Sequence, residues 1–147
     1  MNFIEQFITS FIGRFSNDIE IQLNPDVVTF YCENKIVQAK PILFLESVAD
    51  KPKVLGWGDG LTPADSHIRI KVFDFNDVES KSSLSPEQCL TAFFRIGISK
   101  LVVGRTFIRP KITVRNIDSL TELLSENRKS IVGKSLSDSG ARECIFI

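Results

Sequence analysis

The sequence predicts one α/β domain built on a mixed sheet, preceded by a helix with one strongly apolar face. The first third of the chain alternates apolar and polar residues with a period of two, which indicates strands. Helical patterns then alternate with short apolar segments, the arrangement expected of strands covered on both faces. A length of 147 residues, 43% of them hydrophobic, suffices for one core and is too short for two ordinary domains.

An amphipathic helix is predicted over residues 1–16, ahead of a single domain over residues 17–147. Large apolar residues recur there at the three- and four-residue spacing of one helical face. They are Phe3, Ile4, Phe7, Ile8, Phe11, Ile12 and Phe15. Burying them is worth on the order of 10 kcal/mol before ordering costs, at roughly 1.5 to 3 each. A membrane interface and a protein surface are equally favoured as the partner that covers this apolar face, because Arg14 is the helix's only basic side chain.

Three strands are expected after this helix, the first of which carries a row of polar side chains. The polar row consists of Asp18, Glu20, Gln22 and Asn24, which alternate with apolar residues. Pro25 then predicts a turn, because proline fixes its own φ and disfavours helix in the residue before it. Residues 27–32 and 36–45 form the second and third strands, and Pro41 indicates an edge strand or a bulge in the third. A short strand over 53–58 follows.

Two helices alternate with two strands in the second half of the chain. Ser85 and Gln88 predict a capping box for a helix that reaches about residue 103. Ser119 and Glu122 predict another capping box, for a helix that Gly140 ends. Strands are expected over 112–117 and 144–147, and a serine-rich loop over 79–85. The predicted order is β-β-β-α-β-α-β.

This element order resembles the ribonuclease H-like fold, on which actins, sugar kinases and chaperone ATPases are built. Five short segments also resemble bacterial actin-like proteins of the MreB rod-shape type, in the same order along the chain. They are Phe15-Ser16-Asn17-Asp18, Ile36-Val37 with Pro41, Val54-Leu55-Gly56-Trp57-Gly58, Arg109-Pro110-Lys111-Ile112 and Gly140-Ala141-Arg142-Glu143. The resemblance implies a truncated, divergent relative of this family that contains only its N-terminal subdomain, the actin-like ATPase subdomain I. Membrane-binding helices precede the first segment in the family, where this chain carries its amphipathic helix.

The same resemblance implies a degenerate phosphate loop. Actin-like ATPases place an aspartate on the first strand and then a Gly-Thr turn whose N–H groups approach the phosphates. Gln22 stands at the aspartate position, and Asn24 and Pro25 stand at the turn. A neutral glutamine organises a metal poorly, and proline removes a backbone donor. Since the family's second phosphate loop and adenosine pocket would follow Ile147, we expect no ATP hydrolysis, no cofactor and no metal site.

The composition argues against several other functions. The 18 basic residues balance 18 acidic ones, which leaves no excess charge for nucleic-acid binding. Cys32, Cys89 and Cys144 are too far apart for a zinc site or a disulfide framework, and we expect buried, reduced thiols. His67 has no neighbour at ligand spacing and receives no role. The sequence shows neither a spanning apolar segment nor a signal peptide, so a cytoplasmic protein is expected.

These observations predict a non-catalytic actin-like structural or interaction protein that forms a homo-oligomer such as a dimer. Its expected partners are an MreB-type filament protein or the inner face of the cell membrane, in cell-shape control. One alternative is a metal-dependent nuclease using Asp18 and Glu20 with Asp26 and Asp118, although a solvated strand face is favoured. The other is a nucleotide-binding half-site that a second chain completes.

Overall fold

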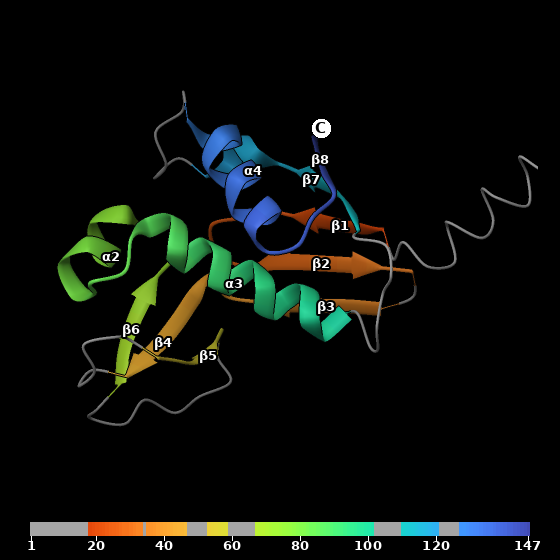
Figure 1. Ribbon diagram of the computed structural model, residues 1–147. Coiled ribbons are helices and arrows are strands. Elements are labelled where there is room, and N and C mark those ends of the chain that lie inside the picture. The colour runs from red at the N-terminus through yellow and green to blue at the C-terminus, as the bar shows by residue number, and fades with distance from the viewer. Residues whose placement is uncertain (1–17, 34, 47–52, 59–66, 102–109, 121–126) are drawn as a thin grey trace, which may run out of the picture.

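The computed structural model describes residues 18–33, 35–46, 53–58, 67–101, 110–120 and 127–147 (Figure 1). The amphipathic helix predicted over residues 1–16, with its seven apolar side chains, lies outside these residues. Within them the chain forms two β-sheets and three α-helices. No helix in this part of the chain is long and apolar enough to cross a membrane.

The larger sheet contains five strands in the order β3-β2-β1-β7-β8. Their bounds are β1 (Ile19–Gln22), β2 (Val28–Cys32), β3 (Lys35–Ala39), β7 (Lys111–Arg115) and β8 (Glu143–Phe146). β1, β2 and β3 form an antiparallel meander, whereas β7 runs parallel to β1 and β8 parallel to β7. The mixed α/β sheet predicted from the sequence is therefore confirmed.

A second, smaller sheet departs from the prediction of a single third strand over residues 36–45. It contains β4 (Ile42–Glu46), β5 (Val54–Trp57) and β6 (His67–Lys71), all antiparallel, in the order β5-β4-β6. The chain leaves the larger sheet at Pro41, where the Ile42 N–H donates to the Lys40 carbonyl at 2.7 Å and closes a three-residue turn. β3 nevertheless lies at an edge of its sheet, as the proline indicated.

Three α-helices and one short 3₁₀ turn accompany the sheets: α2 (Phe75–Lys81), α3 (Pro86–Leu101), η1 (Ile117–Ser119) and α4 (Arg128–Asp138). The first predicted capping box is confirmed, because the Ser85 N–H donates to Gln88 Oε1 at 2.9 Å and the Gln88 N–H donates to Ser85 Oγ at 3.2 Å. The loop predicted over 79–85 was wrong in its first part, because residues up to Lys81 complete α2.

The prediction that Ser119 caps a helix was wrong, and Glu122, the other residue of this predicted capping box, lies outside the described residues. Ser119 belongs to η1, and its hydroxyl donates to the Leu23 carbonyl instead of capping a helix. α4 ends as predicted at Gly140, which has φ +115°, and the Ala141 N–H donates to the Leu136 carbonyl at 3.0 Å.

Helices α3 and α4 pack on one face of the larger sheet (Figure 1). In β7, Ile112 and Val114 are buried, whereas Lys111 and Thr113 are partly exposed and Arg115 is exposed. The expectation that the late strands are covered on both faces is thus wrong for β7 in the described chain.

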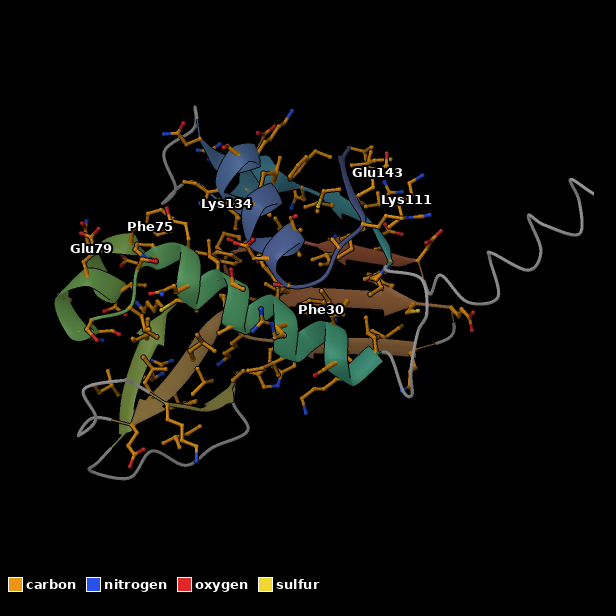
Figure 2. The ribbon with its side chains drawn as sticks, in the orientation of Figure 1. Phe30, Phe75, Glu79, Lys111, Lys134 and Glu143 are labelled. Carbon is orange, nitrogen blue, oxygen red and sulfur yellow. The ribbon has the colours of Figure 1, made fainter. Side chains whose placement is uncertain are left out.

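An aromatic cluster joins α3 to both sheets. Phe30 of β2 is fully buried beneath α3 (Figure 2), and its ring centroid lies 5.7 Å from that of Trp57 in β5 and 6.2 Å from that of Phe93 in α3. Phe93 also lies 5.2 Å from Trp57 and 6.4 Å from Phe73, which follows β6. The two sheets therefore share one core, with α3 as the element common to both.

Gly97 allows α3 to lie directly on the Phe30 ring. A Cβ atom at this position would meet three atoms of the ring at under 3.0 Å, a separation that real Cβ atoms essentially never show. The ring is fully buried and cannot move into open space. Gly133 in α4 is different, because a Cβ there would meet only the Phe146 ring, at an ordinary 3.6 Å.

We predict opposite effects of alanine at these two helical glycines. Gly97→Ala should lower the free energy of unfolding by about 1 to 3 kcal/mol, because overpacking outweighs the gain in helix propensity. Gly133→Ala should leave it unchanged or raise it by up to about 1 kcal/mol. Urea denaturation of both variants measures the difference, and equal stabilities would contradict the close approach at Phe30.

Candidate functional site at the first strand turn

The turn that follows β1 carries the predicted phosphate-loop residues and is anchored from β7. Leu23 is buried, and its N–H donates to the Arg115 carbonyl at 3.0 Å. Its carbonyl accepts hydrogen bonds from Asn116 Nδ2 at 3.0 Å and from the Ser119 hydroxyl at 3.2 Å. Asn116 has φ +66°, a left-handed conformation that asparagine tolerates well. The turn is therefore held in place by residues some 90 positions later in the chain.

Gln22 ends β1, and Asn24 and Pro25 lie in the turn that follows it. Gln22 and Pro25 are exposed, and Asn24 is half-buried. Asn24 Oδ1 accepts a hydrogen bond from the Asp26 N–H at 2.9 Å, which closes a side-chain turn across Pro25. Pro25 has no N–H group, and the Asp26 N–H group is already bonded to the Asn24 side chain. Two of the three residues 24–26 therefore offer no backbone donor to a phosphate.

A pocket of about 350 Å³ lies beside this turn. It is lined by Pro25, Asp26, Lys40, Pro41, Ile42, Lys71, Phe73 and Leu120. Its wall thus combines the turn, the crossing between the two sheets and the end of β6. Two lysines and one aspartate give the wall a basic balance, which suits an anionic group better than a cation.

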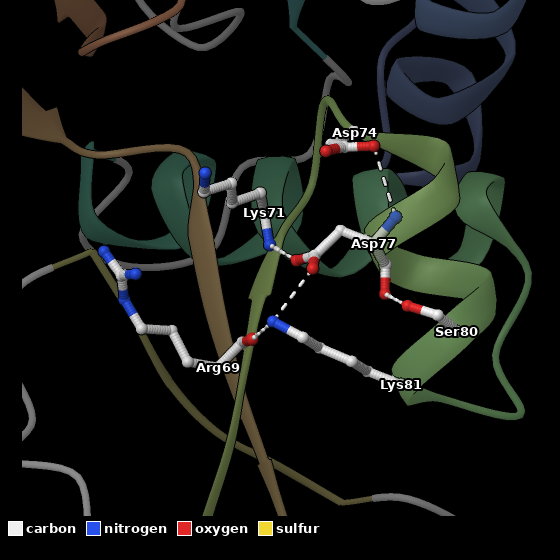
Figure 3. Close-up of polar contacts among 6 residues, drawn as sticks. All are labelled: Arg69, Lys71, Asp74, Asp77, Ser80 and Lys81. Carbon is white, nitrogen blue, oxygen red and sulfur yellow. Dashed lines mark hydrogen bonds and ion pairs between the residues drawn. The ribbon is translucent and has the colours of Figure 1, made fainter.

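Asp77 fixes the end of β6 that contributes Lys71 to the pocket (Figure 3). Asp77 Oδ2 accepts from the Lys71 N–H at 2.8 Å, and Oδ1 pairs with Lys81 Nζ at 2.8 Å. Lys81 Nζ also donates to the Arg69 carbonyl at 3.2 Å, and Asp74 Oδ1 accepts from the Asp77 N–H at 3.2 Å. Helix α2 is therefore tied to the edge of the small sheet at several points.

These contacts shift the pKa of the Asp77 carboxyl. Burial by itself raises the pKa, but the Lys71 N–H and the Lys81 amine outweigh burial and hold it below its ordinary value of 3.8. A carboxyl with a lowered pKa in the folded state stabilises the protein while it is ionised. The contribution is present above the unfolded pKa and is lost as the pH falls through the folded one.

The polar row of β1 does not form a metal site in the described chain. Glu20 pairs with Arg115, and Asp18 Oδ1 accepts from the Lys111 N–H at 3.3 Å and lies 4.0 Å from Arg142 Nη2. Among the described residues, no three histidine, cysteine, aspartate or glutamate side chains converge to hold a metal ion. Asp26 lies in the turn, whereas Asp118, on η1, is 3.9 Å from Arg128 Nη1.

The three cysteines carry free thiols, and two of them are buried as predicted. Cys32 and Cys89 are buried, whereas Cys144 on β8 is only half-buried. Burial raises the pKa of Cys89 and of Cys144 to about 11, and that of Cys32 is raised as well, mainly by burial. Thiols that stay protonated are poor nucleophiles, which argues against a catalytic cysteine.

No protein-family model and no curated protein sequence matches the chain. It is similar to the solved structure of MreB 5 of Spiroplasma citri bound to AMPPNP, with a TM-score of 0.57 and 9% identity. It is also similar to a non-polymerising mutant of MamK bound to AMPPNP, with a TM-score of 0.60 and 12% identity.

The chain has an actin-like fold. The similarity covers 87% of the chain for MreB 5 and 89% for MamK, and it confirms the ribonuclease H-like, actin-like architecture predicted from the sequence. The matched region accounts for 37% of the MreB 5 chain and 41% of the MamK chain. This actin-like chain therefore spans about two fifths of the length of these neighbours.

Sequence reasoning located the turn but missed the rest of the pocket wall. Lys71 and Phe73 come from β6 and its continuation, a region for which no strand was predicted. The signal was present in residues 67–71, where Ile68 and Ile70 alternate with polar residues in the period of a strand. The seven predicted partner-binding residues of the N-terminal helix lie outside the described residues.

We predict that Asp77→Ala lowers the free energy of unfolding by about 2 kcal/mol at neutral pH, since it removes a hydrogen bond to a charged acceptor and an ion pair. The difference from the unaltered chain should shrink as the pH falls below 3.8, because the carboxylate then becomes protonated. Glu79→Ala, on an exposed position of the same helix, is the matched control. Urea unfolding at several pH values measures both, and a pH-independent difference would contradict the role of the charge.

Proposed function

We propose that this chain is a non-catalytic actin-like protein that acts through contacts with other molecules. The observation that carries the proposal is the turn after β1. A phosphate cradle needs several convergent N–H groups, and here Pro25 has none while Asn24 engages that of Asp26. Gln22 adds a neutral amide where a carboxylate would organise metal and water.

MreB 5 and the MamK mutant were both solved bound to AMPPNP, a nucleotide analogue. Their shared fold with this chain makes the turn after its first strand the natural place to look for phosphate contacts. The proline and the side-chain turn make this place unsuited to them, which favours an actin-like scaffold without ATPase activity.

We predict that the chain releases phosphate from ATP no faster than Gln22→Ala does. A coupled phosphate-release assay with Mg²⁺ measures the rate, with each preparation repeated in EDTA. The variant is a suitable control because Gln22 is exposed and its loss should leave the fold intact. A Mg²⁺-dependent rate in the original chain that falls in the variant would refute the non-catalytic proposal.

The second part of the proposal concerns partners. The apolar face predicted for Phe3, Ile4, Phe7, Ile8, Phe11, Ile12 and Phe15 would suit a membrane surface or an actin-like filament protein. The protein would then be cytoplasmic and peripheral at the inner face of the membrane, or part of an MreB-type cytoskeleton in cell-shape control. Self-association into a dimer is a third way to cover the same face.

We expect residues 1–15 to be needed for association with a partner surface. Co-sedimentation of the full chain with liposomes, and separately with filaments of an MreB-type protein, should pellet more protein than a chain lacking these residues. The mass in solution, measured for both chains, detects the dimer. Equal pelleting with both surfaces and an unchanged mass would contradict the role given to the apolar face.

A second candidate function is a nucleotide-binding half-site completed by another chain. The pocket beside the turn favours it, because Lys40 and Lys71 both line this pocket. Calorimetric binding of ATP to the isolated chain, abolished by Lys71→Ala, would favour this function over the first. The nuclease alternative has less support, since Asp18 and Glu20 lie beside Arg142 and Arg115.

A further inference from the structure

A groove separates the edge strand β3 of the larger sheet from the edge strand β5 of the smaller one. Its volume is about 860 Å³, within the range of about 300 to 1,000 Å³ that is typical of ligand sites. Gly58 and Ala39 both line the groove, and Gly58 approaches Ala39 so closely that an added Cβ would lie 3.1 Å from the alanine Cβ. Gly58 has φ +62°, which glycine adopts without strain.

The groove has apolar walls that are not fully buried. Val37 of β3 and Leu55 and Trp57 of β5 line it, and all three side chains are half-buried. The rings of Phe30 and Phe93 pack against the Trp57 ring, at centroid distances of 5.7 and 5.2 Å. A rigidly supported tryptophan with one accessible side is the kind of residue that contributes most to binding.

Two adjacent strand edges allow the groove to form hydrogen bonds with the backbone of a bound segment. In the described chain β3 pairs only with β2, and β5 only with β4. The outer edge of such a strand presents N–H and carbonyl groups to an added strand.

The charged residues that line the groove indicate the chemistry of its partner. Lys40 and Lys100 line it, against the single acidic residue Asp26. Lys100 Nζ lies 6.0 Å from the Trp57 ring centroid, so a positive charge stands directly beside the main apolar anchor. An acidic side chain next to an apolar one is the complementary pattern.

We propose that this groove binds an extended segment of a partner protein that carries an apolar and an acidic side chain two positions apart, and therefore on the same face of the segment. The segment adds a strand to β3, places an apolar side chain against Trp57 and Leu55, and directs a carboxylate to Lys100. The proposal deepens the contact function proposed above by naming a surface and the chemistry of its partner. It is independent of the phosphate-loop argument, so a failure of peptide binding leaves the absence of ATP hydrolysis untouched.

The test uses random peptides of about twelve residues displayed on phage and selected on the full chain. Selected peptides should be rich in aspartate or glutamate two positions from an aromatic or aliphatic residue, the spacing that puts both side chains on one face of a strand. Synthetic copies of the peptides are then titrated into the protein while the fluorescence of Trp57 is followed. This signal reports on the groove because Trp57 is the single tryptophan of the chain. Binding should shift its emission to shorter wavelength.

Variants decide whether the groove is the site. Lys100→Glu should weaken binding about fivefold, and Leu55→Asp about tenfold or more. Lys134→Glu, the same charge change at an exposed position of α4 (Figure 2), should have no effect. Thermal melts establish that each variant is folded. The proposal is overturned if no peptide is selected, if basic peptides are enriched, or if peptides bind Lys100→Glu and Lys134→Glu with equal affinity. It is also overturned if a second copy of the chain fills the groove in a dimer.

Discussion

The Phe30 ring lies where β2, β5 and α3 meet, and most of the structure depends on this contact. On one side Gly97 brings the backbone of α3 directly onto the ring. On another side Trp57 carries the small sheet into the same core, at a centroid distance of 5.7 Å. Because Phe30 is fully buried, none of these neighbours can shift independently of the others. One aromatic side chain thus sets the spacing of both sheets from the helix that they share.

Two surfaces of functional interest lie near the sheet crossing at Pro41. The pocket beside the first turn includes Pro41 and Lys71, whereas the groove lies between β3 and β5. Lys40 and Asp26 line both, so the two surfaces adjoin. The pocket is bordered by a turn with few available donors, whereas the groove offers apolar side chains, strand edges and positive charge. These properties suit contacts with other proteins better than phosphate chemistry.

The actin-like fold by itself does not determine activity, because scaffolds of this kind host many functions. The hydrogen bonding of one turn bears more directly on phosphate binding. Pro25 and the side chain of Asn24 limit the backbone donors of this turn, while Leu23 keeps the turn anchored to Asn116. A turn can therefore stay anchored in the fold while it offers few backbone donors, since packing and phosphate binding use different atoms.

The sequence by itself determined the elements that depend on local interactions. The alternating pattern of β1, the capping box at Ser85 and the helix end at Gly140 each involve residues a few positions apart, and their patterns are therefore legible in the chain. The same holds for Gln22, Asn24 and Pro25, which lie within four positions of one another. Only the tertiary structure decided that residues 36–45 divide between two sheets, that Asp77 ties α2 to β6, and that Trp57 and Lys100 share a groove. These features depend on contacts between residues distant in sequence, which periodicity and propensity do not encode.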